Sequence, residues 1–201
     1  MSDSIIQKDF YRESGRYLSH FQILKKCYSP NLHYIYLFRK AQRYYKIPVI
    51  GLFYKLLLRH YQILYGFQIY PETEIGEGLY LGHWGHLVIN PKAKIGKNCN
   101  IAQGVTIAQS NRGKSEGVPV IGDEVWIGPN AVIVGKVTIG NNVLIAPNAY
   151  VNTDVPSNSV VIGNPAVITS NINATEGYIN NKVSDKICSK YSCGFTIRDY
   201  S

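Results

Sequence analysis

The chain contains few cysteines and lacks any long apolar run. Its four cysteines are scattered over 201 residues, which excludes the disulfide framework of a small secreted domain. We therefore expect reduced thiols and a cytoplasmic protein. The most apolar stretch, residues 47–58, is interrupted by Lys55 and is shorter than the roughly 20 residues that cross a bilayer. The opening residues, MSDSIIQKDF, also lack the basic run and apolar core of a signal peptide.

Acidic residues are scarce in the first third of the chain. Residues 1–67 contain 11 Lys and Arg against 3 Asp and Glu, whereas residues 68–201 contain 10 of each, so the net charge of +8 belongs to the first segment. Aromatic and aliphatic residues recur there at helical spacing, with Pro30 and Pro48 as natural helix starts, so we predict two or three helices. Such basic helices either cap the open end of the neighbouring domain or form a surface that lies on an anionic membrane. Of the two interpretations we favour the cap.

An apolar side chain returns at every sixth residue through the middle of the chain. The repeat consists of Ile69, Ile75, Leu81, Ile89, Ile95, Ile101, Ile107, Ile121, Ile127, Ile133, Ile139, Ile145 and Val151. Six is not a helical period, and this spacing is the hexapeptide repeat of a parallel β-helix. Each six-residue side presents one anchor to a narrow interior, and small residues let the backbone turn at the corners. The predicted fold class is therefore mostly β.

This repeat divides the chain into three predicted parts. Residues 1–66 form an N-terminal helical segment, and residues 67–168 form the β-helix domain. Residues 169–201 are polar, rich in Ser and Asn, and lack periodicity. We expect them to form a flexible or loosely docked tail.

The sixfold spacing is interrupted twice. The step from Leu81 to Ile89 is eight residues, and the step from Ile107 to Ile121 is fourteen. A regular coil needs no extra residues, so insertions in a solenoid usually become loops on a functional face. Candidate functional residues therefore lie in two inserted segments, GHWGH at residues 82–86 and QSNRGKSE at residues 109–116.

Four short motifs resemble the serine acetyltransferase branch of the hexapeptide-repeat acyltransferases. They are GLYLGH at 78–83, QGVTI at 103–107, PVIGD at 119–123 and GNPA at 163–166. The resemblance covers about half of the chain, and its nearest likeness is to the short group found in bacterial polysaccharide gene clusters. It implies a left-handed parallel β-helix, a homotrimer with active sites between neighbouring subunits, and acetyl-CoA as the donor.

The catalytic histidine of that family falls on His83. Acetyl transfer from a thioester to a hydroxyl needs a base for the hydroxyl proton and a donor for the charge on the carbonyl oxygen, and imidazole titrates near neutral pH. We expect His83 to act as this base by direct transfer in a ternary complex, because no Cys or Ser motif indicates an acyl-enzyme. His86 either positions the acceptor, serves as a second base, or is a packing residue. A His pair without a third ligand does not predict a metal site.

Other family positions differ in this chain. Gln68 replaces the aspartate that pairs with the catalytic histidine, Gly82 replaces a second aspartate, and Val118 and Gly117 replace a histidine and an arginine. Free serine brings an ammonium and a carboxylate, which need charged partners. We therefore predict a sugar hydroxyl of a capsule or lipopolysaccharide precursor as the acceptor, with serine O-acetylation as the alternative and a noncatalytic scaffold as a third reading. The candidate acceptor-binding residues are Gln68, Trp84 and Glu116.

Coenzyme A is expected along the groove between coils, where small side chains expose backbone amides to the pantetheine arm. These positions are Ala108, Gly128, Pro129, Ala146 and Pro147. Arg112 and Lys114 in the second inserted segment are either partners for its phosphates or solvated loop charges. Gln68, Glu116 and a backbone carbonyl are the candidates that orient the His83 ring. We expect no nucleic-acid partner, and a location in the cytoplasm, with contact to the inner face of the membrane if the basic helices bind lipid.

Overall fold

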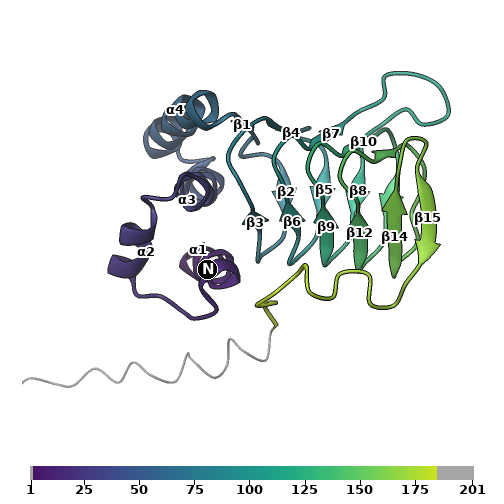
Figure 1. Ribbon diagram of the computed structural model, residues 1–201. Coiled ribbons are helices and arrows are strands. Elements are labelled where there is room, and N and C mark those ends of the chain that lie inside the picture. The colour runs from purple at the N-terminus through teal and green to yellow at the C-terminus, as the bar shows by residue number, and fades with distance from the viewer. Residues whose placement is uncertain (1, 185–201) are drawn as a thin grey trace, which may run out of the picture.

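A computed structural model describes residues 2–184 and places a group of helices at one end of a β-solenoid (Figure 1). The helices are α1 (Ser2–Ser14), α2 (His20–Lys26), α3 (Pro30–Tyr44) and α4 (Pro48–Tyr65). The strands are β1 (Phe67–Gln68), β2 (Glu74–Ile75), β3 (Tyr80–Leu81), β4 (Leu87–Ile89), β5 (Lys94–Ile95), β6 (Asn100–Ile101), β7 (Thr106–Ala108), β8 (Val120–Ile121), β9 (Val125–Ile127), β10 (Val132–Val134), β11 (Thr138–Ile139), β12 (Val143–Ile145), β13 (Tyr150–Val151), β14 (Ser159–Ile162) and β15 (Val167–Ser170).

The helix ends follow local sequence signals. Pro30 and Pro48 stand at the starts of α3 and α4, where a missing N–H costs nothing. α4 ends at Gly66 in the left-handed conformation, with φ of 74°. The prediction of two or three helices was too low, because the short α2 depends on a capping box between Ser19 and Gln22 rather than on a long apolar pattern. None of the described helices is long and apolar enough to cross a membrane.

The predicted parallel solenoid is confirmed. Successive coils contribute to three sheets: a first sheet in the order β1-β4-β7-β10-β13, a second in the order β11-β8-β5-β2, and a third in the order β15-β14-β12-β9-β6-β3. Among the named strands of residues 2–184, the pairings are parallel except that between β14 and β15. Because every third strand joins the same sheet, each coil makes one triangular turn of a prism.

The interior of the prism holds the predicted anchors. Ile107, Ile127 and Ile133 are fully buried, and so is Cys99 at its repeat position. Burial raises the pKa of the Cys99 thiol to about 12, so that side chain serves as a small apolar group and is a poor nucleophile. This environment fits direct acetyl transfer rather than an acyl-enzyme at Cys99.

The helices cover the open end of the solenoid, as the cap interpretation expects (Figure 1). Tyr34 and Phe38 of α3 belong to the same buried cluster as Phe67 and Ile69 of the first coil. These side chains therefore cover the apolar interior of the first coil, which would otherwise be open to solvent at this end of the prism.

A buried ion pair fixes this cap to the first coil. The Arg39 Nε lies 2.7 Å from an Asp9 carboxylate oxygen, and both side chains are almost fully buried. The guanidinium also donates to the carbonyls of Ile75 (2.8 Å) and Gly76 (2.6 Å), while the Leu79 amide donates to Asp9 (2.9 Å). Burial raises the pKa of the Asp9 carboxyl, and the Arg39 guanidinium acts in the opposite direction. One charge pair therefore joins α1, α3 and the solenoid.

The chain after β15 runs back along the third sheet toward α1 (Figure 1). Asparagine side chains of two different coils hold it: Asn142 donates to the Ile172 carbonyl at 2.7 Å, and Asn98 bonds the Val183 backbone through both its amide and its oxygen. For residues 171–184 the expectation of a loosely docked tail is therefore wrong. Residues 185–201, the rest of that predicted tail, lie outside the described residues, and the three predicted domain boundaries remain predictions.

Candidate functional site

The first inserted segment forms an exposed bend between β3 and β4, which we call the histidine bend (residues 82–86). Leu81 pairs with Ile101, 20 residues along the chain, whereas Ile89 pairs with Ile107, 18 residues along. The two extra residues of this coil are accommodated in the bend. The side chains of His83 and His86 are exposed there, and Trp84 is 60% exposed.

The helices hold the backbone of the histidine bend in place. The side-chain amide of Asn31 in α3 donates to the Gly82 carbonyl at 2.9 Å. The Gly85 amide donates to the carbonyl of Tyr65 at the end of α4, at 3.0 Å. The Leu87 amide likewise donates to the Gly66 carbonyl at 3.0 Å. A Cβ on Gly66 would lie 3.0 Å from the Gly85 carbonyl carbon, so a glycine is needed for this close approach. The cap therefore also positions the histidines.

A cavity of about 270 Å³ lies beside the bend, between α4 and the first sheet. Gln68 of β1 and His86 of the bend both line it, together with Arg59 and Gln62 of α4. Gln62 donates to the Ile69 carbonyl at 2.9 Å, which fixes the end of β1 next to Gln68. The structure thus brings two of the predicted site residues together and adds Arg59, which the sequence reasoning missed.

The ring of His83 forms no hydrogen bond with the residues that the structure describes. Within one chain, neither Gln68, Glu116 nor a backbone carbonyl orients it. Gln103 is a further residue that the sequence reasoning passed over, although it opens the QGVTI motif. Its side-chain oxygen is buried and accepts no hydrogen bond from any described residue, and a Cβ on Gly85 would lie 3.6 Å from the Gln103 Cβ. An unpaired acceptor therefore lies next to the histidine bend.

The second inserted segment forms a small hairpin (residues 109–117) that projects from the solenoid between β7 and β8 (Figure 1). Ser110 and Gly117 form its antiparallel bridge, and the Lys136 amide of the next coil donates to Ser115 at 2.8 Å. This hairpin is at the corner between the first and second sheets, whereas the histidine bend is at the corner between the third and first sheets. Within one chain, Arg112, Lys114 and Glu116 are therefore not brought to the histidines.

The predicted coenzyme A positions are divided between the same two corners. Gly128 and Pro129 follow β9, and Ala146 and Pro147 follow β12, so these four residues continue the corner of the histidine bend. Ala108 ends β7 beside the hairpin. Close packing requires the small residues, since a Cβ on Gly128 would lie 2.7 Å from the Pro147 nitrogen.

The expected use of these backbone amides is wrong in one respect. The amides of Gly128 and Ala146 donate to Ile145 and Val161 of the next coil, each at 2.8 Å. The solenoid ladder therefore uses these N–H groups itself, and Pro129 and Pro147 have none. At these four positions the backbone therefore has no free N–H donor for a pantetheine arm within the described residues.

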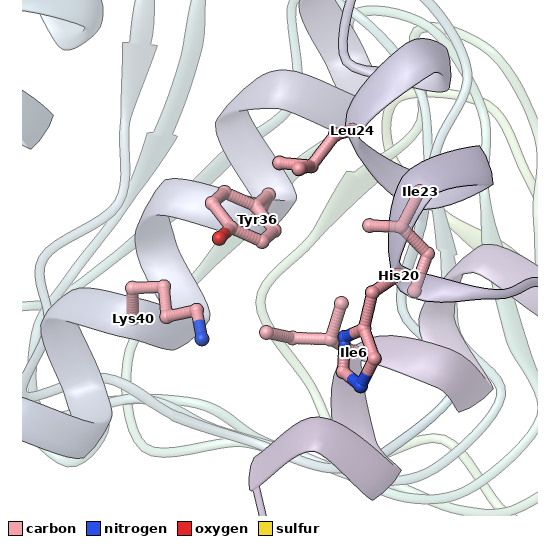
Figure 2. Close-up of a pocket in the computed structure, with 6 residues that line it drawn as sticks. All are labelled: Ile6, His20, Ile23, Leu24, Tyr36 and Lys40. Atoms are coloured by element: carbon pink, nitrogen blue, oxygen red, sulfur yellow. The ribbon is translucent and has the colours of Figure 1, made fainter.

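A second cavity between the N-terminal helices has a different character. It measures about 70 Å³ and is lined by residues of α1, α2 and α3. Figure 2 shows Ile6, Ile23 and Leu24 there with the polar groups of His20, Tyr36 and Lys40. The volume is well below the 300–1,000 Å³ of usual ligand pockets, so this space is a packing gap between helices.

No group of three His, Cys, Asp or Glu residues within 2–184 is arranged to hold a metal ion.

Comparisons with known proteins agree with this geometry. The sequence profile described as "Bacterial transferase hexapeptide (six repeats)" matches residues 119–153. A serine acetyltransferase of Helicobacter pylori is 30% identical over 142 residues, which cover 68% of this chain and 80% of the relative. The chain belongs to the hexapeptide-repeat acyltransferases, with serine acetyltransferases as its homologues.

Other relatives in this acyltransferase family are longer. Serine acetyltransferase 2 of Arabidopsis thaliana is 38% identical over 103 residues, which cover 51% of this chain but 32% of the plant protein. The chain spans about half the length of the Synechococcus elongatus serine acetyltransferase, at 33% identity and 60% coverage of this chain.

Solved acyltransferase structures share both the helices and the solenoid. Serine acetyltransferase of Neisseria gonorrhoeae in complex with serine superimposes with a TM-score of 0.68 at 30% identity, covering 84% of this chain and 69% of that one. The Brucella abortus serine acetyltransferase in complex with coenzyme A gives 0.67 at 28% identity, covering 85% and 66%.

These findings overturn the predicted sugar acceptor. The relatives and the solved structures named above are serine acetyltransferases, so the prediction of capsule or lipopolysaccharide acetylation is wrong, and the likeness to the polysaccharide-cluster group is not supported. The error has a physical source. The family motifs align only solenoid positions, where Gly117 replaces an arginine, whereas the cavity that contains Gln68 also contains Arg59 of α4.

Proposed function

We propose that this chain transfers the acetyl group of acetyl-CoA to the hydroxyl of serine. The observation that carries this proposal is the similarity to the Helicobacter pylori serine acetyltransferase over 80% of that protein. The match to the neisserial enzyme in complex with serine supports the acceptor, and the Brucella enzyme in complex with coenzyme A supports the donor.

His83 acts as the general base in this proposal. Its exposed imidazole takes the hydroxyl proton as the serine oxygen attacks the thioester carbon. Acetyl-CoA supplies the activated acyl group and, after the carbon–sulfur bond breaks, a thiolate that the His83 imidazolium reprotonates. His86 and Gln68 line the adjoining cavity, where they position the acceptor. The narrow corner at Gly128 and Pro147 is the surface along which the pantetheine arm reaches the bend.

The test is a continuous assay of coenzyme A release by purified full-length protein. We expect release that depends on both acetyl-CoA and L-serine, with O-acetylserine identified by mass spectrometry. Glucose and N-acetylglucosamine serve as control acceptors and are expected to give only the background rate of hydrolysis. Release that does not respond to serine at millimolar concentration would contradict the proposal.

We also propose that the complete site forms between subunits of a homotrimer. The candidate residues lie at two different corners of one solenoid, so the histidine bend of one subunit meets the hairpin 109–117 of its neighbour only across an interface. Light scattering is expected to give three times the chain mass of 22.6 kDa.

Mixed trimers test which subunit supplies each part. A His83→Ala variant and an Arg112→Ala, Lys114→Ala double variant are each expected to have low activity. Co-assembled, they should regain part of the wild-type turnover, because some interfaces then combine an intact bend with an intact hairpin. Activity no higher than that of the separate variants would place both parts in one subunit.

The outward face of α4 is proposed to contact an anionic membrane surface. Val49, Leu52, Phe53 and Leu56 are more than half exposed on it, and residues 20–66 contain eight Lys and Arg but no Asp or Glu. A second copy of this face would bring like charges together, whereas anionic lipid complements them.

Vesicle sedimentation tests the membrane contact. Binding is expected to vesicles that contain phosphatidylglycerol and not to pure phosphatidylcholine, and Leu56→Glu should abolish it. Val167→Glu, at an exposed site on β15 at the far end of the solenoid, is the matched control. Equal sedimentation of wild type and Leu56→Glu would contradict the contact.

A further inference from the structure

The cavity beside the histidine bend has an uneven charge. Arg59 is the one cation among the described residues that line it, and none of them is Asp or Glu. Its other polar side chains are the neutral amides of Gln62 and Gln68 and the imidazole of His86. A cavity of this composition favours an anionic group on its ligand.

Arg59 has no acidic partner in the part of the chain that the structure describes. The other arginines of the described helices are engaged: Arg39 pairs with Asp9, Arg12 donates to the Asn100 side chain and to the Asn180 carbonyl, and the Arg43 guanidinium lies over the Tyr44 ring. Arg59 is exposed and forms no ion pair with the residues between 2 and 184. Its guanidinium is therefore free to bind a ligand, with five donors in a planar fork.

The position of Arg59 relative to the histidine bend is fixed by the backbone. α4 continues from Arg59 for less than two turns before its end at Tyr65, whose carbonyl accepts the Gly85 amide. Gln62, on the next turn, is itself bonded to the Ile69 carbonyl. Hydrogen bonds thus join the end of α4 to β1 and to the histidine bend. An acceptor held by Arg59 therefore stays close to the histidines.

We infer that Arg59 binds the carboxylate of the serine acceptor, an inference that rests on the proposed function. A guanidinium recognises a carboxylate through two parallel N–H···O bonds. The solenoid lacks this group, because Gly117 stands where the family resemblance places an arginine. The helical cap then supplies the positive charge for the serine carboxylate that the solenoid lacks. Gln68 and His86 face the rest of the amino acid.

Kinetics with serine and with serinamide, which has no carboxylate, test this role. In Arg59→Gln the KM for serine is expected to rise about tenfold, since the lost bond is charge-assisted but partly exposed to solvent. The KM for acetyl-CoA should stay unchanged. Wild-type protein should prefer serine over serinamide in kcat/KM, and Arg59→Gln should lose most of this preference. A merely structural residue would not affect the two acceptors differently.

Two further variants sharpen the comparison. Arg59→Lys keeps the charge without the planar fork, so its KM for serine should lie between those of wild type and Arg59→Gln. Lys55→Gln removes a cation one turn earlier on α4, outside the cavity lining, and should leave all constants unchanged. Wild-type protein that fails to acetylate serine would overturn the proposed function and this inference with it. Serine acetylation with an unchanged KM and unchanged preference in Arg59→Gln would overturn the inference alone.

Discussion

Replacing His83 by alanine is expected to lower serine-dependent turnover by about two to four orders of magnitude, the usual contribution of a positioned general base. The affinity for acetyl-CoA should not change, because the imidazole acts on the hydroxyl proton rather than on the donor. The side chain is exposed and makes no hydrogen bond within residues 2–184, so its removal should leave the fold intact. Steady-state kinetics and calorimetry with coenzyme A measure the two quantities.

His86→Ala is the matched control for this prediction. It removes the same ring from the same bend, three residues later, and also leaves an exposed position. We expect a smaller loss, mainly in the KM for serine, because His86 lines the acceptor cavity. Turnover in His83→Ala within threefold of wild type would show that His83 is not the base. A larger loss in His86→Ala than in His83→Ala would indicate that His86 is the base.

Breaking the buried pair between Asp9 and Arg39 is expected to lower the free energy of unfolding by about 3–5 kcal/mol, since either single change leaves an unpaired charge in the interior. Asp9→Leu and Arg39→Met are the single variants. The double variant should recover part of the loss because it leaves no buried charge, although the carbonyls of Ile75 and Gly76 still lose their donor. Urea titration followed by circular dichroism gives the free energies.

An exposed pair supplies the control. Lys94 and Glu74 lie 3.0 Å apart on the second sheet with both side chains more than half exposed, and Lys94→Met should cost less than about 1 kcal/mol. A loss in Asp9→Leu as small as this would mean that the cap is not held by its charge pair.

Loss of serine binding in the Asp9 and Arg39 variants, at temperatures where they remain folded, is expected because the same cap positions the histidine bend.

The solenoid could be predicted from the sequence because its determinant is local and repeated. One apolar anchor in every six residues fixes which side chains face the interior. The spacing of six is interrupted after Leu81 and after Ile107, where the two inserted segments begin. The docked segment after β15 could not be predicted in this way. Asn98 and Asn142 hold it through backbone carbonyls of residues 183 and 172, and an asparagine in a sequence gives no sign of which distant carbonyl it will bind.

The candidate site was predictable only where it lies on the solenoid. The interruption of the sixfold spacing predicted His83 and His86 as candidates, and the family resemblance singled out Gln68, which lines one cavity with His86. Glu116 of the hairpin was predicted to lie near His83, but spacing along the chain does not reveal which corner of a prism an insertion reaches. Arg59 was missed for a related reason, since its role depends on how α4 packs against the first coil.

A crystal structure of the full chain grown with coenzyme A and serine tests the role of His83 most directly. We expect a serine hydroxyl about 2.6–3.2 Å from a ring nitrogen of His83, with the coenzyme thiol end reaching the same bend along the corner of Gly128 and Pro147. Serine bound in a place that residues 82–86 of no subunit approach would contradict it.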